Sequence, residues 1–287
     1  MSAVLKSARW LLPALLLAQG CDTGENEEEP GKTYTVRFSP QVREQALACG
    51  TSYTDIGTSR SIIELLDFKV YVRDVALVRA GGERHALKLE QDGTWQRDAI
   101  ALLDFEDGTG TCDTGSPLTR TEIVGTAPEH DDYTGLEFKL GLPPDMNHLD
   151  GATAPAPLNA PGMWWSWQGG YKFVRLDVKS RGNDSFFFHL GSSGCRGSVA
   201  EGFTCTSDNQ ATVTLTNFNP ERNQVVLDAA GLYAQLDVDQ VADGRTDTLA
   251  GCMSSAADPE CPKMFEQLGL AVDGSSRPLP STFIRVR

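Results

Sequence analysis

Apolar and polar residues alternate along seven separate stretches of this 287-residue chain, and this period of two limits the possible folds more than any other feature. The stretches are rich in β-branched and aromatic residues and cover residues 33–38, 68–78, 133–142, 171–180, 184–190, 211–218 and 232–238. Side chains point alternately to the two faces of a strand, so each stretch is predicted to be half-buried. The pattern predicts an all-β protein, an antiparallel β-sandwich in one domain from residue 33 to residue 287.

Helical periodicity is scarce outside these stretches. The segments "QVREQALAC" near the start of the predicted domain and "PKMFEQLGL" near its end are the good candidates for short helices. We therefore expect a few short helices and a helical content under about a fifth of the chain, against about a third in an average globular protein.

The first twenty residues predict export. Lys6 and Arg9 precede the apolar run "WLLPALLLA", which is too short to span a bilayer and is typical of a signal peptide. Cys21 follows it in a sequence similar to a lipobox, although Ala18 stands where leucine is usual. Residues 21–32 are acidic and predict a flexible tether. We expect Cys21 to carry a lipid that anchors the protein to the outer membrane, in the periplasm or at the cell surface. The alternative is a secreted protein with an incidental Cys21.

The charge of the mature chain argues against nucleic acid as a partner. Removal of residues 1–20 takes away Lys6 and Arg9 and no acidic residue, so 23 basic residues face 39 acidic ones and the net charge is −16. Such a chain repels a phosphate backbone, and its acidity mostly favours solubility.

Six cysteines remain after Cys21, and an even set in an exported chain predicts disulfides. Cys195 and Cys205, like Cys252 and Cys261, would close short polar loops, which leaves Cys49 for Cys112. A thiolate metal site is the competing interpretation, but the chain has no CxxC pair and an oxidising compartment disfavours free thiols.

Two of the four histidines are candidate metal ligands. His85 and His130 lie among charged and turn residues and are expected at the solvated surface. His148 follows a predicted strand in a proline-fixed turn, and His189 ends a strand of three phenylalanines, where an apolar neighbourhood favours the neutral, ligand-competent imidazole. Each alone is more often a structural histidine than a ligand.

Three tryptophans crowd into the segment "GMWWSWQGGYKF". In an extended chain Trp165 and Trp167 point to one face and Trp164 to the other. Such residues could fill the core, form a platform that stacks on sugar rings, or serve as sites of one-electron oxidation.

A long ordered set of segments resembles the MbnP family, the methanobactin-associated copper-binding proteins also described as the four-Cys member of a metallo-mystery pair. The segments are "DFKVYVRDVALV", "ALLDFEDGTGTC", "YTGLEFKLGLPPDMNHLDGATAPAPLNAPGMWWSWQGGYKFVRLDV", "FFFHLGSSGC", "GCMSSAADPEC" and "MFEQLGL", and together they cover nearly all of the chain after the tether. The resemblance implies a periplasmic or surface-anchored β-protein that binds copper and is not an enzyme. It also implies a partner, a dihaem cytochrome c peroxidase-like enzyme of the MbnH type, which oxidises a tryptophan of the WxW segment to kynurenine.

Carried over to this chain, the WxW pair is Trp165 and Trp167, and the family histidines match His148 and His189. The four-Cys pattern matches Cys195, Cys205, Cys252 and Cys261, whereas Cys49 and Cys112 are additional. Kynurenine offers an aromatic amine, and with two imidazoles it would form a nitrogen-rich site that suits copper. The rival functions are a carbohydrate-binding module, which needs neither histidine, and a purely structural surface lipoprotein. Convergence of the histidines near the WxW face would separate these hypotheses.

Overall fold

The computed structural model describes residues 31–166, 168–244, 249–255, 257–271 and 281–287. The expected signal peptide, Cys21 and Trp167 lie outside these residues. No helix among the described residues is long and apolar enough to cross a membrane.

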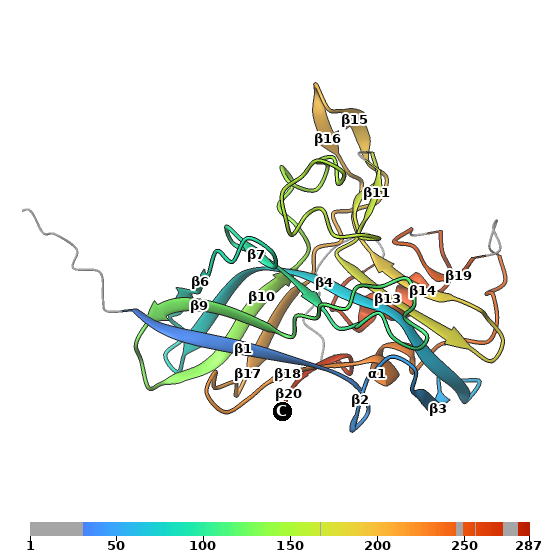
Figure 1. Cartoon of the computed structure of the whole chain (residues 1–287), viewed down its shortest axis with the longest axis horizontal. Coiled ribbons are helices and arrows are strands. Elements are labelled where there is room, and N and C mark those ends of the chain that lie inside the picture. The colour runs from blue at the N-terminus through green and yellow to red at the C-terminus, as the bar shows by residue number, and fades with distance from the viewer. Residues whose placement is uncertain (1–30, 167, 245–248, 256, 272–280) are drawn as a thin grey trace, which may run out of the picture.

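Two sheets make up most of the described chain (Figure 1). The smaller runs in the order β20 (Ile284–Val286), β18 (Val225–Asp228), β1 (Gly31–Val42), β9 (Glu122–Pro128) and β6 (Lys88–Leu89), with β2 (Gln45–Ala46) paired to β1. Strand β1 begins at Gly31, so the last two residues of the expected tether belong to this sheet.

The larger sheet is built around the long strand β4. It runs in the order β17 (Thr212–Thr216), β10 (Tyr133–Leu140), β4 (Ser61–Arg79), β13 (Val174–Ser180), β14 (Phe186–Leu190) and β19 (Ala250–Cys252). Four more strands join it through β4 and β8: β3 (Ser52–Ile56), β5 (Arg84–Ala86), β7 (Gln96–Arg97) and β8 (Ile100–Asp104). Most neighbours are antiparallel, as predicted, but β1 pairs in parallel with β18, and β14 with β19.

The hydrophobic core lies between the two sheets, which pack against each other and do not close into a barrel. Phe38 of β1 meets Phe138 of β10 edge to face, with ring centroids 5.7 Å apart, and Tyr34 meets Tyr133 in the same way at 5.5 Å. Both pairs join a strand of one sheet to a strand of the other. The prediction of a β-sandwich-like, mostly antiparallel fold is therefore confirmed.

Two hairpins stand outside the sheets, at the top of the view in Figure 1. Strand β11 (Trp164–Ser166) pairs with β12 (Gly170–Tyr171), and β15 (Arg196–Ser198) pairs with β16 (Gly202–Thr204). The tryptophan segment therefore belongs to one of these hairpins, and the Cys195–Cys205 segment encloses the other.

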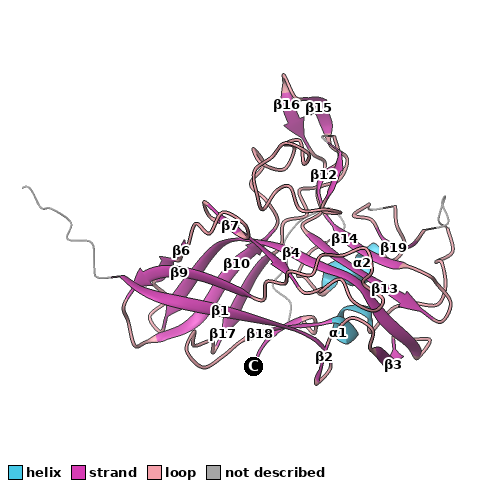
Figure 2. Ribbon diagram, in the orientation of Figure 1, coloured by secondary structure: helices cyan, strands magenta, loops and turns pink. Residues whose placement is uncertain are grey.

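The two described helices are short and lie at the other end of the sheets from β6 and β9 (Figure 2). Helix α2 (Cys261–Glu266) confirms the prediction from "PKMFEQLGL". The helix predicted over residues 41–49 is wrong, because Arg43 takes a positive φ of 57° and turns the chain so that β2 pairs back on β1.

The predicted strand 232–238 is also wrong. Helix α1 (Ala229–Tyr233) occupies its start, capped by the Asp228 carboxylate, which accepts a hydrogen bond from the backbone N–H of Ala230. The buried residues recur at helical spacing, at Ala229, Leu232, Tyr233 and Leu236, and this periodicity prevails over the local alternation.

All three predicted disulfides are present. The Cα atoms are 5.7 Å apart in Cys49–Cys112, 3.8 Å in Cys195–Cys205 and 4.7 Å in Cys252–Cys261. Their presence is consistent with an exported protein.

Candidate metal centre

His189 is buried on the outer face of the larger sheet and is held by a carboxylate. The side chain is 4% exposed, and its Nε2 lies 2.7 Å from Oδ1 of Asp177. The register of β13 and β14 pairs Arg175 with His189 and Asp177 with Phe187, so all four side chains emerge on one face. The contact is therefore built into the pairing of two strands.

The protonation of this pair leaves a lone pair on the histidine. Burial lowers the pKa of His189 more than Asp177 raises it, so the imidazole is neutral near pH 7. Burial opposes ionisation of Asp177, but the hydrogen bond from His189 and the charge of Arg175 together hold the pKa of that carboxyl below its usual range. Nε2 then carries the proton and donates a hydrogen bond to the ionised Asp177, while the buried Nδ1 has no hydrogen-bond partner among the described residues.

This arrangement is the one found behind metal-bound histidines. A carboxylate that accepts from one ring nitrogen fixes the tautomer, the ring orientation and the basicity of the other. A buried polar atom without a partner calls for an explanation, and a metal ion on Nδ1 supplies one. The residues present therefore fit a copper ligand at His189.

Trp165 lies beside this imidazole. The two rings have centroids 6.2 Å apart at 56°, and the Lys172 ammonium sits 5.7 Å from the indole. Gly191 makes the approach possible, because a Cβ there would come within 2.6 Å of Trp165 Cζ3. The structure thus brings together two of the predicted site residues, Trp165 and His189.

Trp164 faces away from Trp165, as the alternation of an extended chain predicts. It packs over Gly151 and against the hydrophobic core, and its Nε1 is buried. Both described tryptophans of this segment are partly buried. They do not form the exposed platform that a carbohydrate-binding module would need.

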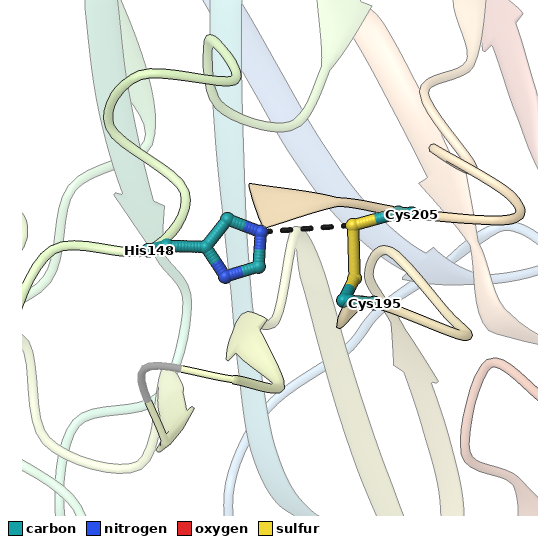
Figure 3. A group of neighbouring side chains, drawn as sticks. All are labelled: His148, Cys195 and Cys205. Carbon is teal, nitrogen blue, oxygen red and sulfur yellow. Dashed lines mark hydrogen bonds between the residues drawn. A yellow bond between two sulfur atoms is a disulfide. The ribbon is translucent and has the colours of Figure 1, made fainter. Parts of the chain in front are cut away.

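His148 is held in the turns after β10, against the other hairpin. Its ring stacks on Phe203 at a centroid distance of 4.3 Å and an angle of 16°, and its Nε2 lies 3.6 Å from Sγ of Cys205 (Figure 3). The hairpin β15–β16 therefore fixes the orientation of this imidazole.

The residue before His148 connects the two histidine regions. Asn147 Nδ2 donates to Ser192 Oγ at 3.2 Å, and its Oδ1 accepts from the backbone N–H of Tyr171 at 3.0 Å. Ser192 lies just beyond β14, which carries His189, and Tyr171 lies in β12, which pairs with β11. Both histidines therefore border the tryptophan hairpin β11–β12.

A chain of ion pairs holds Asp177, the hydrogen-bond partner of His189. This chain was not predicted from the sequence. Arg175 Nε lies 2.7 Å from Asp177 Oδ2, and its NH1 lies 2.8 Å from Asp67 Oδ2. Asp67 in turn contacts Lys69 Nζ at 3.0 Å. The position of Asp177 thus depends on charges spread over β4 and β13.

Lys69 is the centre of this buried cluster. Its ammonium lies 3.0 Å from Asp67, 3.4 Å from Asp104 and 2.5 Å from Glu106, and all four side chains are at most 5% exposed. Burial raises the pKa of Asp104 to about 7 against the opposing charge of Lys69. One ammonium therefore contacts three carboxylates, of which Asp67 also pairs with Arg175, and the lining of a cavity of about 610 Å³ includes Asp67, Lys69, Asp104 and Arg175.

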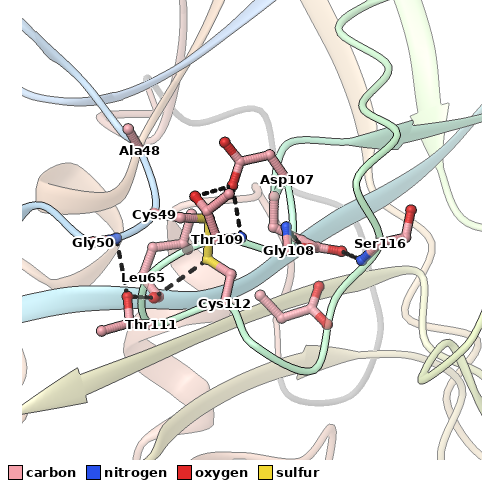
Figure 4. Close-up of a disulfide and its surroundings, with 12 residues drawn as sticks. Ala48, Cys49, Gly50, Leu65, Asp107, Gly108, Thr109, Thr111, Cys112 and Ser116 are labelled. Carbon is pink, nitrogen blue, oxygen red and sulfur yellow. Dashed lines mark hydrogen bonds between the residues drawn. A yellow bond between two sulfur atoms is a disulfide. The ribbon is translucent and has the colours of Figure 1, made fainter.

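The disulfide Cys49–Cys112 holds the loop that follows β8 (Figure 4). Beside the bridge, Thr111 Oγ1 donates to the carbonyl of Leu65 in β4 at 2.5 Å. The backbone N–H groups of Gly108 and Ser116 each donate to Glu106 at 2.9 Å. The bridge therefore fixes the loop that orients Glu106 toward Lys69.

The other two histidines lie elsewhere in the fold. The His85 side chain is 14% exposed, its ring is 4.9 Å from that of His130, and both rings meet Tyr133 edge to face. The expectation of two solvated histidines is wrong, because pairing of β5 with β4 places His85 opposite Leu77. Neither ring adjoins the tryptophan hairpin in the contacts described.

The fold and the histidine beside the tryptophan hairpin define an exported-type β-protein with a candidate metal centre at the end of strand β14 in its larger sheet. The model of the MbnP family matches residues 31–254, and the chain belongs to this family. It is similar in structure to MbnP from Methylosinus trichosporium, with 31% sequence identity and a TM-score of 0.80, over 90% of this chain and 98% of that one. No curated protein matches the sequence. Family membership implies a copper protein of the methanobactin system.

Proposed function

We propose that this protein binds copper outside the cytoplasm, for uptake, storage or delivery, and is not an enzyme. Its ligands are His189, His148 and a tryptophan of the WxW segment after oxidation to kynurenine. The single observation that carries the proposal is the buried Nδ1 of His189, which has no partner among the described residues, while Asp177 holds the other ring nitrogen. Two imidazoles and an aromatic amine are donors that suit copper.

The oxidised residue is Trp165 or Trp167, and the position of Trp165 beside His189 favours Trp165. An intact indole offers no lone pair outside its ring system and is a poor ligand. Oxidation by two molecules of hydrogen peroxide, each reduced to water, breaks the indole C2–C3 bond and adds one oxygen atom to each of these carbons. Hydrolysis by one water molecule then releases C2 as formate. The freed aryl amine is the new nitrogen donor. The catalyst is a dihaem cytochrome c peroxidase-like partner of the MbnH type.

Expression with and without the dihaem partner tests this function. Protein made alone should keep intact tryptophans and bind copper weakly. Coexpressed protein should show the mass change for one carbon replaced by one oxygen, and it should bind copper more tightly in a competitive titration. Peptide mapping of Trp165→Phe and Trp167→Phe variants identifies the modified residue. A coexpressed protein with unmodified tryptophans, or a modified one with no gain in copper affinity, would contradict the proposal.

Localisation at the outer membrane through a lipid on Cys21 is part of the same proposal. The support is the lipobox-like "AQGC" and the acidic segment that follows it. Substitution of Cys21 by serine should move the protein from the membrane fraction to the soluble periplasmic fraction and leave its thermal unfolding unchanged. Equal membrane association of both forms would refute the anchor.

A further inference from the structure

The disulfide Cys195–Cys205 differs from the other two in its accessibility. Both of its cysteines are partly exposed, whereas Cys252–Cys261 is completely buried and Cys49–Cys112 has one partly exposed cysteine, Cys49. It closes the ends of the hairpin β15–β16, whose strands pair with each other and with no other described strand. A reductant therefore reaches this bridge more readily than the others.

The same bridge lies against a histidine. One ring nitrogen of His148 and the two sulfur atoms all lie within 4.8 Å of one another, and the sulfur nearer to His148 is 3.6 Å from Nε2 (Figure 3). In the oxidised state these sulfurs are bonded to each other and are poor ligands. After reduction they are two thiols beside an imidazole.

We propose that reduction of Cys195–Cys205 creates a second metal site, in which two thiolates and His148 bind one Cu(I) ion. A dithiol reductant supplies two electrons and two protons to break the S–S bond and is itself oxidised to a disulfide. Both new thiols then lose their protons to solvent as they bind the metal, and the copper does not change its redox state. This site shares His148 with the function proposed above and goes beyond it, because its other ligands are two thiolates and neither His189 nor an oxidised tryptophan takes part.

The ligand types select this metal. Thiolates are soft donors that favour Cu(I), and a set of three protein ligands satisfies its low coordination number, whereas structural zinc requires four. The surroundings also keep the ligands together after the bridge opens. Asn147 ties the His148 turn to Ser192 and Tyr171, and the antiparallel pairing of Arg196 with Thr204 holds the cysteine ends of the hairpin side by side.

The test uses protein expressed without the dihaem partner, so that the tryptophans stay intact. The protein is treated with dithiothreitol, desalted without oxygen and titrated with Cu(I) against bathocuproine disulfonate. Alkylation and peptide mapping should find Cys195 and Cys205 reduced first. The reduced protein should bind one Cu(I) at least about tenfold more tightly than the oxidised protein, a difference of about 1.4 kcal/mol. X-ray absorption of the complex should show copper–sulfur scattering.

Matched variants separate this site from the one proposed for function. Three changes should each remove the gain in Cu(I) affinity: alkylation of the two thiols, the double variant Cys195→Ser and Cys205→Ser, and His148→Ala. Circular dichroism should show that the fold persists in each case. His189→Ala should keep the gain. Three results would each overturn the inference: first reduction at either of the other two bridges, a reduced protein that binds Cu(I) no more tightly than its alkylated form, or loss of the gain in His189→Ala. Failure of kynurenine formation would leave this site untouched.

Discussion

Alanine in place of His189 is expected to abolish tight copper binding by the oxidised-tryptophan form of the protein. His189 supplies a neutral imidazole. Its Nε2 donates a hydrogen bond to Asp177, and its Nδ1, the proposed ligand atom, is buried. Removal of one of three nitrogen donors should lower copper affinity by at least about 100-fold, beyond the range for loss of an outer hydrogen bond. His148→Ala should have a comparable effect. Competitive titration of both variants against the wild-type protein measures the loss.

Three further variants make this test specific. His85→Ala and His130→Ala remove imidazoles that lie against Tyr133 and should leave copper affinity unchanged. Asp177→Asn keeps the size of the side chain but can no longer fix the tautomer as a charged acceptor, so we expect a loss of about 10- to 100-fold. Unchanged copper binding in the double variant His148→Ala and His189→Ala would exclude both residues as ligands.

The sequence predicted best those strands in which apolar residues line one face and polar residues the other. Strands β1, β4, β10, β13, β14 and β17 all fall within or across the predicted stretches. The disulfides were also predictable. Two pairs of cysteines are separated by only ten and nine residues in the sequence, and one pair remains. Both signals are local in the sequence, so no knowledge of the tertiary packing was needed.

The ion pairs that hold Asp177 were not predictable, because they depend on contacts between segments that are distant in the sequence. Alternation assigns Arg175 and Asp177 to the polar face of β13, and a polar face is expected to meet solvent. In the structure Gly162 packs closely on the Arg175 guanidinium, and Arg175 pairs with Asp177 and with Asp67 of β4. Only the packing of segments distant in sequence, a long-range property, turns this polar face into an ion-pair network.

The His189–Asp177 contact is an intermediate case. The sequence placed His189 at the end of an apolar strand and correctly favoured a neutral imidazole, which agrees with the lowered pKa. Its partner depended on the register of β13 against β14, which alternation alone does not fix. A search for an aspartate two positions from the residue opposite a strand-end histidine would have found Asp177 once that register was known.

Substitution of Lys69 by alanine is expected to cost about 3–5 kcal/mol in the free energy of unfolding, the range for removal of one partner from a buried charge network. The loss leaves Asp67, Asp104 and Glu106 buried without their shared cation. Urea denaturation at pH 7 measures it. Lys69→Met, which keeps most of the apolar stem, should be almost as unstable if charge and not packing is responsible. Lys179→Ala, an exposed residue of β13, should change the stability by less than about 0.5 kcal/mol.

The pH dependence of this loss identifies its electrostatic origin. Without Lys69 the pKa values of Asp67 and Asp104 rise further above their unfolded values, since burial already raises both of them, that of Asp104 to about 7. A group whose pKa is raised on folding binds its proton more tightly in the native state, so its stabilising contribution is present at low pH and is lost as the pH rises through the folded pKa. The deficit of Lys69→Ala relative to the wild-type protein should therefore shrink between pH 8 and pH 5. A deficit that stays constant across this window would mean that lost packing, and not the lost charge of Lys69, accounts for the instability.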